Sequence, residues 1–390
     1  MLITEAYTPQ KIESTKPRSA CWGDAQSIPL EDQVINFNRV LAANDYRDVK
    51  NGFRSFAAQL LDRQQITMAQ YVSVFGGNAL NCITQDNSGR FNDMQTGADA
   101  SKLVQAYSRA KYGSIEDIRY FASMVIANLS QSLDSPNSHW SRLFKSAKSN
   151  CDSVVLMTTG WRNVPSTANV LYDIVTEHIN LKLAHLDLPT IINVKLPRIA
   201  PPCENYASLT AEEREQVKQI QDHVIPDRNF YQWSGVHVIF GDDVLVTGST
   251  ADKVFFESMC SGAKSFQAIY PIAIDPRRAF TDATIEERLN MVAVTGQLDN
   301  AMAHILAHPH YRPILRSLRI LFGKANHESL PSFFPQLFPN RWLSLYKAAL
   351  GNELLQQDDC KPSLLMLRDY LTNLKFLSSD GRCCMDKLSD

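Results

Sequence analysis

Two adjacent acids follow an apolar run near the middle of the chain, and a turn rich in hydroxyl groups comes three residues after them. The stretch VHVIFGDDVLVTGST spans residues 236–250, so Asp242 and Asp243 stand where a buried strand should end. Carboxylates accept hydrogen bonds from sugar hydroxyls. The free amides, the hydroxyls and the dipole at the start of the next helix favour a phosphate. The spacing therefore suits a ribose 5-phosphate.

A helix cap, a phosphatase motif and a Walker loop are the alternatives for this stretch. Ser249 and Asp252 could form a capping box, and the acid pair could simply be polar residues at the end of a strand. A helix cap is, however, compatible with phosphate binding. A phosphatase of the haloacid dehalogenase type needs Asp-x-Asp, whereas Gly241 and Val244 flank the acid pair. The turn also lacks the Gly-Lys-Ser/Thr ending of a Walker loop. The acid pair and the turn thus remain best explained together, as one site.

The stretch VIFGDDVLVTGST resembles the phosphoribosyl-pyrophosphate signature of type I phosphoribosyltransferases: a hydrophobic strand, two acids, three mostly apolar residues and Thr-Gly-x-Thr. One departure is Gly241, where the family usually has an apolar residue. The resemblance implies that Asp242 and Asp243 are catalytic, hold the ribose hydroxyls and stabilise the cationic ring. It assigns the 5-phosphate to Val246, Thr247, Gly248, Ser249 and Thr250.

The same resemblance predicts a pyrophosphate-binding loop after the first strand of the core. The turn after the strand at 152–159 supplies Thr159, Gly160, Trp161 and Arg162, in which the glycine can bring amides toward an anion and the arginine can add a charged fork. Lys195 and Arg198 follow the next strand and are similar to a Lys-x-x-Lys of the orotate-using branch. Taken alone, the turn could equally be a surface turn, and the basic pair could equally be solvated charges.

The activity implied is transfer of ribose 5-phosphate from phosphoribosyl pyrophosphate to a nitrogen of a nucleobase or a similar small molecule, with release of pyrophosphate. Mg²⁺ is the implied cofactor, held at Asp242 and Asp243 mostly through substrate and water. A homodimer is common among similar enzymes. The helical flanks give a faint further resemblance to uncharacterised members from bacterial stress and tellurite-resistance gene clusters. The alternative is a catalytically silent protein that senses the ligand and acts through its helical flanks.

Composition is that of an ordinary globular protein, with 390 residues of which 44% are hydrophobic and 21% charged. With 39 basic and 41 acidic residues, the near-neutral charge disfavours a nucleic-acid partner. The start lacks a signal-peptide core and no apolar run is long enough to span a bilayer, so the expected location is the cytoplasm, without a membrane partner. Eight cysteines without a Cys-x-x-Cys pair are expected to be reduced thiols.

Hydrophobic periodicity predicts an α/β protein with a largely parallel sheet between two helical flanks. Strands are expected near 152–159, 189–196, 235–242 and 264–274, alternating with helices near 167–186 and 251–262. The expected divisions are a mainly helical region at 1–148, a phosphoribosyltransferase-like core at 149–282 and a helical region at 283–390. The Gly- and Asn-rich stretch 75–97 is expected to be loop, and 284–309 to be one long helix.

Three further groups of residues are weaker candidates. Asp275, Arg277 and Arg278 stand where a base could be recognised, although an ordinary charged turn is the better explanation. The spacing of His304 and His308 could hold a metal, but Pro309 breaks the geometry and a charged helix end is favoured. The long polar segment 201–216 resembles the loop that closes over the active site in the family.

Overall fold

The computed structural model describes residues 77–197 and 235–384, apart from 247, 249, 252, 253, 256, 257, 259–261 and 283. The strands are β1 (Gly77–Gln85), β2 (Phe91–Asp93), β3 (Ser153–Trp161), β4 (Ile191–Pro197), β5 (Val236–Gly241), β6 (Val244–Leu245) and β7 (Ser265–Ile274). The longer helices are α5 (Ser101–Lys111), α6 (Ile115–Asp134), α7 (His139–Asn150), α8 (Thr167–His185), α13 (Asn300–Ala307), α14 (Leu315–Phe322), α16 (Pro339–Leu350) and α17 (Lys361–Asn373). Short helices are α11 (Pro276–Thr281), α12 (Ile285–Asn290) and α15 (Leu330–Phe333), with 3₁₀ turns at Lys324–Asn326, Phe334–Gln336 and Leu354–Gln356.

The strands form one mostly parallel sheet in the order β2-β1-β7-β5-β3-β4, and β6 pairs with β7. Only the pairing of β1 with the short β2 is antiparallel among the described strands. A parallel sheet must be covered on both faces. The chain is therefore an α/β protein, as the alternation of strand and helix patterns predicted.

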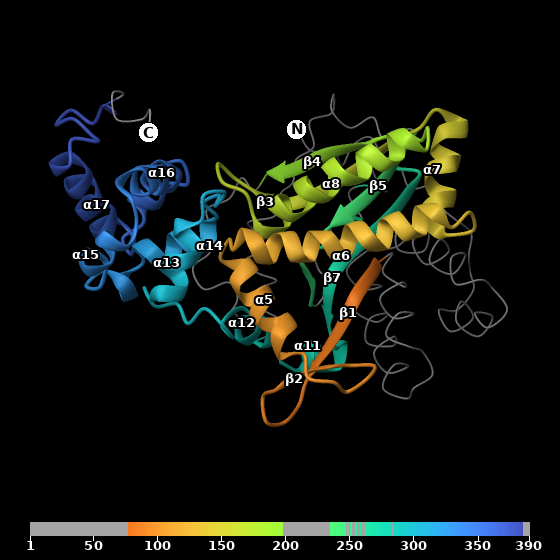
Figure 1. The fold of residues 1–390 in the computed structure, drawn as a ribbon, viewed down its shortest axis with the longest axis horizontal. Coiled ribbons are helices and arrows are strands. Elements are labelled where there is room, and N and C mark those ends of the chain that lie inside the picture. The colour runs from red at the N-terminus through yellow and green to blue at the C-terminus, as the bar shows by residue number, and fades with distance from the viewer. Residues whose placement is uncertain are drawn as a thin grey trace, which may run out of the picture.

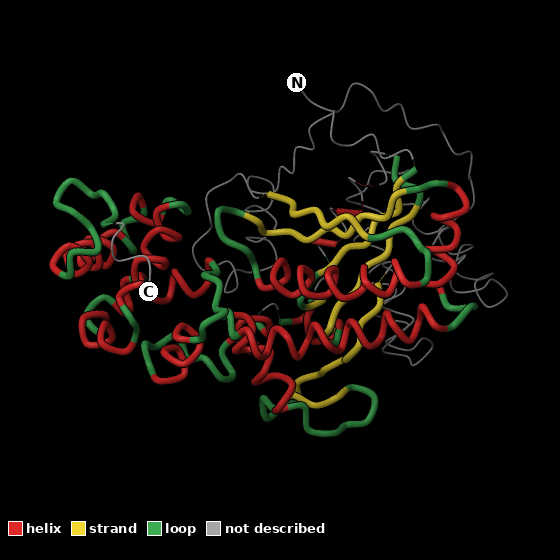
Figure 2. The backbone as a smooth tube through the Cα atoms, turned by 45° about the horizontal axis from the view of Figure 1, so that its top comes forward, coloured by secondary structure: helices red, strands yellow, loops and turns green. Residues whose placement is uncertain are grey.

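The central strands are apolar on both faces, which explains their unbroken hydrophobic runs. Along β5, Ile239 belongs to the core on one side of the sheet, whereas Val238 and Phe240 belong to the core on the other side. Helices α6 and α8 pack against each other and cover the first side (Figures 1 and 2). The helical residues after β6, among them Phe255, pack with the second core.

The stretch 75–97 was wrongly predicted to be loop, because Gly77–Gln85 forms strand β1, which lies between β2 and β7 in the sheet order. Two polar residues of β1 have tertiary partners that no local pattern reveals. The Asn81 amide donates to the Pro271 carbonyl at 2.9 Å, and the Thr84 hydroxyl donates to Asp275 at 2.9 Å. The sheet therefore extends into the part of the chain that was expected to be a helical flank, and is not confined to 149–282.

A second group of helices lies beside the sheet and has its own core. Helices α13–α17 enclose buried side chains that include Trp342, Phe322 and Leu364, and they lie to one side of the α/β part (Figure 1). We call residues 294–384 the C-terminal unit. The expected helix at 284–309 is in fact two helices, α12 and α13, because β-branched residues and Gly296 interrupt it and Asp299 caps a new start.

Four strands and the helix α8 of the expected core lie where the sequence pattern predicted them. β3, β4, β5 and β7 lie at the expected positions, and Ser114 caps α6 by accepting a hydrogen bond from the Asp117 amide. Apolar residues at spacings of three and four also predict helices near residues 31–65, and a polar helix is expected at 210–224; both ranges lie outside the described residues.

Candidate functional site

The acid pair and the Gly160 turn lie at the carboxyl ends of neighbouring strands. β3 pairs in parallel with β4 on one side and with β5 on the other. From β3 the chain proceeds to β4 in one direction across the sheet, and from β5 it proceeds to β7 in the opposite direction, so the strand order reverses between β3 and β5. Such a reversal opens a crevice at the carboxyl edge of a parallel sheet, where ligands bind. Asp242 and Asp243 follow β5, and Gly160 stands at the end of β3. The structure thus brings these two predicted groups to adjacent strand ends.

Asp243 forms a buried ion pair with a lysine that the sequence did not single out. The Lys111 ammonium lies 2.7 Å from the Asp243 carboxylate, and both side chains are largely buried. Lys111 comes from the last turn of α5, and the hydroxyl of Tyr107, one turn earlier, lies 3.5 Å from the same carboxylate. The Tyr107 and Lys111 spacing of four residues places both on one helix face, which is a signal that the sequence carries. Helix α5 therefore supplies the counter-charge to the acid pair.

Asp242 has a different environment from its neighbour. Burial raises the pKa of the Asp242 carboxyl to about 8, and the nearby Asp243 carboxylate acts in the same direction, while Lys111 opposes them. One Asp242 oxygen accepts a hydrogen bond from the Asp243 amide at 2.9 Å. At neutral pH the two acids and Lys111 together therefore carry little net charge.

Gly241, the departure from the family pattern, is explained by the packing of Tyr172. A Cβ at this position would lie only 2.6–2.7 Å from atoms of the Tyr172 ring. The Tyr172 hydroxyl donates to the Ile269 carbonyl and lies 3.3 Å from the Asp242 carbonyl, so the ring from α8 is held over the strand end. Glycine is thus required by the neighbour that fixes the backbone of the acid pair.

The expected phosphate turn is described only in part. Val246 is partly buried, and Gly248 has a φ of 71°, which favours glycine. Thr250 and Ala251 are helical, so the turn leads into a helix as expected. Thr247 and Ser249 lie outside the described residues.

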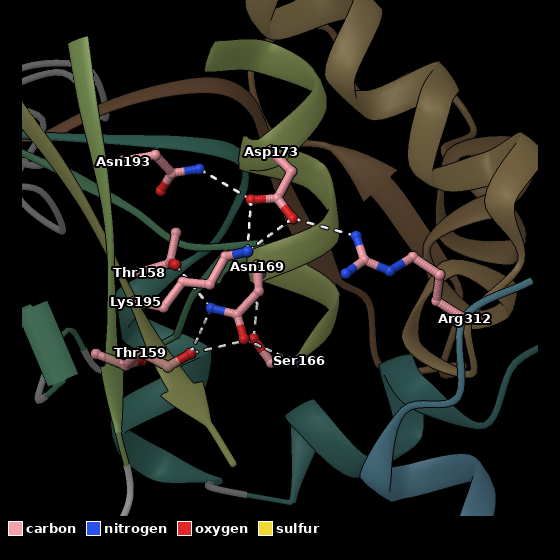
Figure 3. A network of polar contacts seen from close by, with 8 residues as sticks. All are labelled: Thr158, Thr159, Ser166, Asn169, Asp173, Asn193, Lys195 and Arg312. Carbon is pink, nitrogen blue, oxygen red and sulfur yellow. Dashed lines mark hydrogen bonds and ion pairs between the residues drawn. The ribbon is translucent and has the colours of Figure 1, made fainter. Parts of the chain in front are cut away.

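The turn at Gly160 is held by the first residues of α8. Gly160 has a φ of 81°, so glycine is needed here as well. Ser166 and Asn169 form a capping box at the start of α8, the Ser166 hydroxyl donates to the Thr159 carbonyl at 3.1 Å, and the Asn169 amide donates to the Thr158 hydroxyl at 2.7 Å (Figure 3). The strand was predicted to end at Thr159, but β3 continues through Trp161, so Gly160 lies in an irregular strand end that α8 holds in place.

The loop that follows Gly160 is anchored in the C-terminal unit. Val164 is buried among the apolar residues of that unit, and the Asn163 amide donates to the Gly351 carbonyl. The Arg162 amide donates to the Val164 carbonyl at 3.2 Å and closes the loop. The C-terminal unit thus contacts the carboxyl edge of the sheet directly at the predicted pyrophosphate loop.

Lys195 lies beside this loop but is joined to an acid. Its ammonium is 3.0 Å from the Asp173 carboxylate and 4.9 Å from the centre of the Trp161 ring. Arg312 reaches the same carboxylate from the C-terminal unit at 3.2 Å (Figure 3). Arg198 lies outside the described residues, as do Tyr206, Arg214 and the rest of the segment at 201–216.

The weaker candidates after β7 make contacts that hold the local structure. Asp275 caps α11 and pairs with Arg277 at 2.8 Å, while Arg278 donates to Asn87. His304 and His308 belong to the end of α13, and within the described ranges no group of three His, Cys, Asp or Glu side chains could hold a metal ion. None of the described helices is both long and apolar enough to cross a membrane.

The fold and the carboxyl-edge site define an α/β protein with a mostly parallel sheet. Comparison with protein-family models, curated proteins and solved structures finds no match to this chain. The function must therefore be argued from the site itself.

Proposed function

We propose that the protein is a phosphoribosyltransferase of the type I fold, which transfers ribose 5-phosphate from phosphoribosyl pyrophosphate to a nitrogen of a nucleobase or base-like molecule. One observation carries the proposal: the acid pair follows β5, Gly160 stands at the end of β3, and these two strands flank the reversal of strand order. In the motif these two groups serve the ribose and the pyrophosphate, which are joined in one substrate.

The roles of the residues follow from the chemistry of the transfer. A nitrogen attacks C1 of the ribose as pyrophosphate leaves, so positive charge develops on the ring and negative charge on the leaving group. Asp242 and Asp243 would accept hydrogen bonds from the ribose hydroxyls and stabilise the ring. The turn at 246–250 would bind the 5-phosphate. The amides at Thr159–Trp161, with Arg162, Lys195 and Arg198, would receive the pyrophosphate.

Lys111 would control the charge of the acid pair. Because it neutralises Asp243, the pair does not repel the phosphates of the substrate as two bare carboxylates would. This arrangement suits a polyanionic substrate.

Mg²⁺ fits this site as a cation shared with the substrate. Asp242 and Asp243 offer carboxylate oxygens, which Mg²⁺ prefers, but Lys111 already occupies one of those oxygens. Mg²⁺ would therefore be held by the acid pair mostly through water and substrate oxygens, and would neutralise the charge of the leaving pyrophosphate.

The test is calorimetric titration with phosphoribosyl pyrophosphate and Mg²⁺. We expect the intact chain to bind, and Asp242→Asn/Asp243→Asn to lose at least about tenfold in affinity because the ribose hydroxyls lose the carboxyl oxygens that accept their hydrogen bonds. Asp187→Asn is the matched control, since Asp187 is an exposed acid paired with Lys148. It should bind as the intact chain does.

A panel of bases, with release of pyrophosphate as the readout, then separates catalysis from sensing. Release with at least one base supports the transferase. Tight binding without release from any base would instead favour a ligand sensor acting through its helical flanks. Absence of binding by the intact chain would contradict both functions.

A further inference from the structure

Two cations from distant parts of the chain share one carboxylate beside the Gly160 turn. Lys195 from β4 and Arg312 from the segment between α13 and α14 both contact Asp173 of α8. The Asn193 amide donates to the same carboxylate at 2.9 Å. Two positive charges thus face a single negative charge, and the cluster carries one positive charge in excess.

The cluster lies on the face of α8 that is turned toward the predicted pyrophosphate loop. Asn169, which holds the turn through Thr158 and Thr159, and Asp173 are four residues apart and share a helix face. Figure 3 shows them side by side, with Lys195 and Arg312 reaching Asp173 from two directions. The ring of Trp161, the residue after Gly160, lies under the Lys195 ammonium. Lys195 therefore links the cluster to the residue that follows Gly160.

Arg312 retains an accessible guanidinium although it contacts Asp173. Its side chain is 47% exposed, whereas that of Asp173 is 18% exposed. A guanidinium has several donors in a planar fork that matches phosphate oxygens, so one contact to Asp173 leaves others directed elsewhere. Arg312 can therefore bind an anion at the mouth of the cluster.

We propose that Arg312 is a pyrophosphate-binding residue supplied by the C-terminal unit, and that Asp173 is the internal counter-ion with which the pyrophosphate competes for Lys195 and Arg312. This inference deepens the proposed function and rests on it. It gives the C-terminal unit a part in the site: the unit anchors the loop after β3 through Val164, and its Arg312 contacts the same carboxylate as Lys195.

The competition predicts opposite effects for the two partners of one ion pair. Arg312→Gln removes a cation, so it should weaken binding of inorganic pyrophosphate by about tenfold, as expected for a charged hydrogen bond. Asp173→Asn removes the competing carboxylate, so it should strengthen binding severalfold. A purely structural ion pair would not produce changes of opposite sign, because loss of either partner would disturb the same contact.

The experiment is calorimetric titration of the full chain with inorganic pyrophosphate, and separately with phosphoribosyl pyrophosphate and Mg²⁺. Arg368→Gln is the matched control, because Arg368 is an exposed arginine of the same unit that pairs with Asp369. It should leave both affinities unchanged. Arg312→Lys, which keeps the charge without the fork, should fall between the intact chain and Arg312→Gln, and serves in its place if that variant does not fold.

The outcomes separate this inference from the proposed function. Suppose that the intact chain binds both ligands. If the Arg312 and Asp173 variants then bind with unchanged affinity, or if both variants bind more weakly, the inference is overturned and the function stands. If pyrophosphate binding follows the predicted opposite signs but phosphoribosyl pyrophosphate does not bind, the inference stands and the function is overturned. If the intact chain binds neither ligand, both are overturned.

Discussion

At the scale of single residues, Gly241 lets the Tyr172 ring of α8 pack against the end of the strand that leads to the acid pair. Gly241→Ala would drive a Cβ into the Tyr172 ring, at 2.6–2.7 Å in the present packing. We expect a loss of about 1–3 kcal/mol in the free energy of unfolding, as for other overpacked sites. Urea denaturation followed by circular dichroism measures the loss.

The matched variant is Tyr172→Leu/Gly241→Ala, in which the ring that would clash is gone. If the ring causes the loss, the cost of the alanine should largely vanish when it is measured against Tyr172→Leu alone. An equal cost with and without the ring would show that the clash with Tyr172 is not the cause.

Asp242 should make stability depend on pH in an unusual direction for an acid. Its folded pKa, about 8, lies above the ordinary value of 3.8, so the folded state holds a proton that the unfolded state has lost. The stabilising contribution is present at low pH and is lost as pH rises from about 4 toward 8. Asp242→Asn, which cannot ionise, should therefore gain stability over the intact chain as pH increases through that range.

Denaturation of both proteins at several pH values between about 4 and 9 checks this prediction. Asp187→Asn, at an exposed acid, should show no such widening gap. A constant difference between Asp242→Asn and the intact chain across the range would mean that Asp242 is already ionised in the folded state.

The sequence identified the acids and the glycine turn but not Lys111, Asp173 or Arg312. The first group lies within short segments whose order of residue types is informative by itself. The second group makes contacts between distant parts of the chain. Lys111 is 132 residues from Asp243, Asp173 is 22 residues from Lys195, and Arg312 is 139 residues from Asp173. Such pairs depend on how helices pack against the sheet, and a single sequence does not record that packing.

At the scale of elements, the capping box of α8 positions the turn at Gly160. Ser166→Ala would leave the backbone N–H of Asn169 without its acceptor and would remove the hydrogen bond from the Ser166 hydroxyl to the Thr159 carbonyl. We expect a loss of about 1 kcal/mol in stability. We also expect weaker binding of pyrophosphate, since the turn loses its support. Denaturation and calorimetry measure the two effects.

Ser149→Ala is the control for this prediction. The Ser149 hydroxyl is exposed and donates to the Lys145 carbonyl of its own helix, so its loss should change stability by no more than about 0.5 kcal/mol. Equal losses for the two serines would contradict a special role for the cap.

The prediction of helices and strands succeeded where burial produced a regular apolar pattern. It failed where polar residues of a strand are satisfied by partners distant in sequence. β5 and β7 have continuous apolar runs because both faces are covered, and they were predicted correctly. β1 was missed because Asn81 and Thr84 are satisfied by β7 and by Asp275, at sequence separations of 190 and 191 residues. Turn-forming residues in a strand give the signal of a loop when only neighbours in sequence are considered.

At the scale of the whole molecule, Val164 connects the α/β part to the C-terminal unit. Val164→Ala would leave a cavity in the C-terminal core and should cost about 1–3 kcal/mol. Because the cavity lies in that core, amides of α14 and α16 should lose more protection than those of β5 and β7. Hydrogen exchange followed by mass spectrometry resolves the two regions.

Val175→Ala is the matched control, since Val175 of α8 is buried in the core that covers the sheet. It should produce the reverse pattern, with the larger loss in the sheet. If both variants lower protection equally everywhere, the two cores unfold as one unit, and Val164 is not a separate link between them.

The pairing of β1 with β7 has a consequence for folding during synthesis on the ribosome. Asn81 of β1 and Pro271 of β7 are 190 residues apart in sequence, yet their strands are neighbours in the sheet. At ordinary rates of synthesis, β1 emerges roughly 10–40 s before its partner. During that interval one edge of β1 has no strand to pair with, so we expect the nascent protein to depend on chaperones more than its modest apolar content suggests.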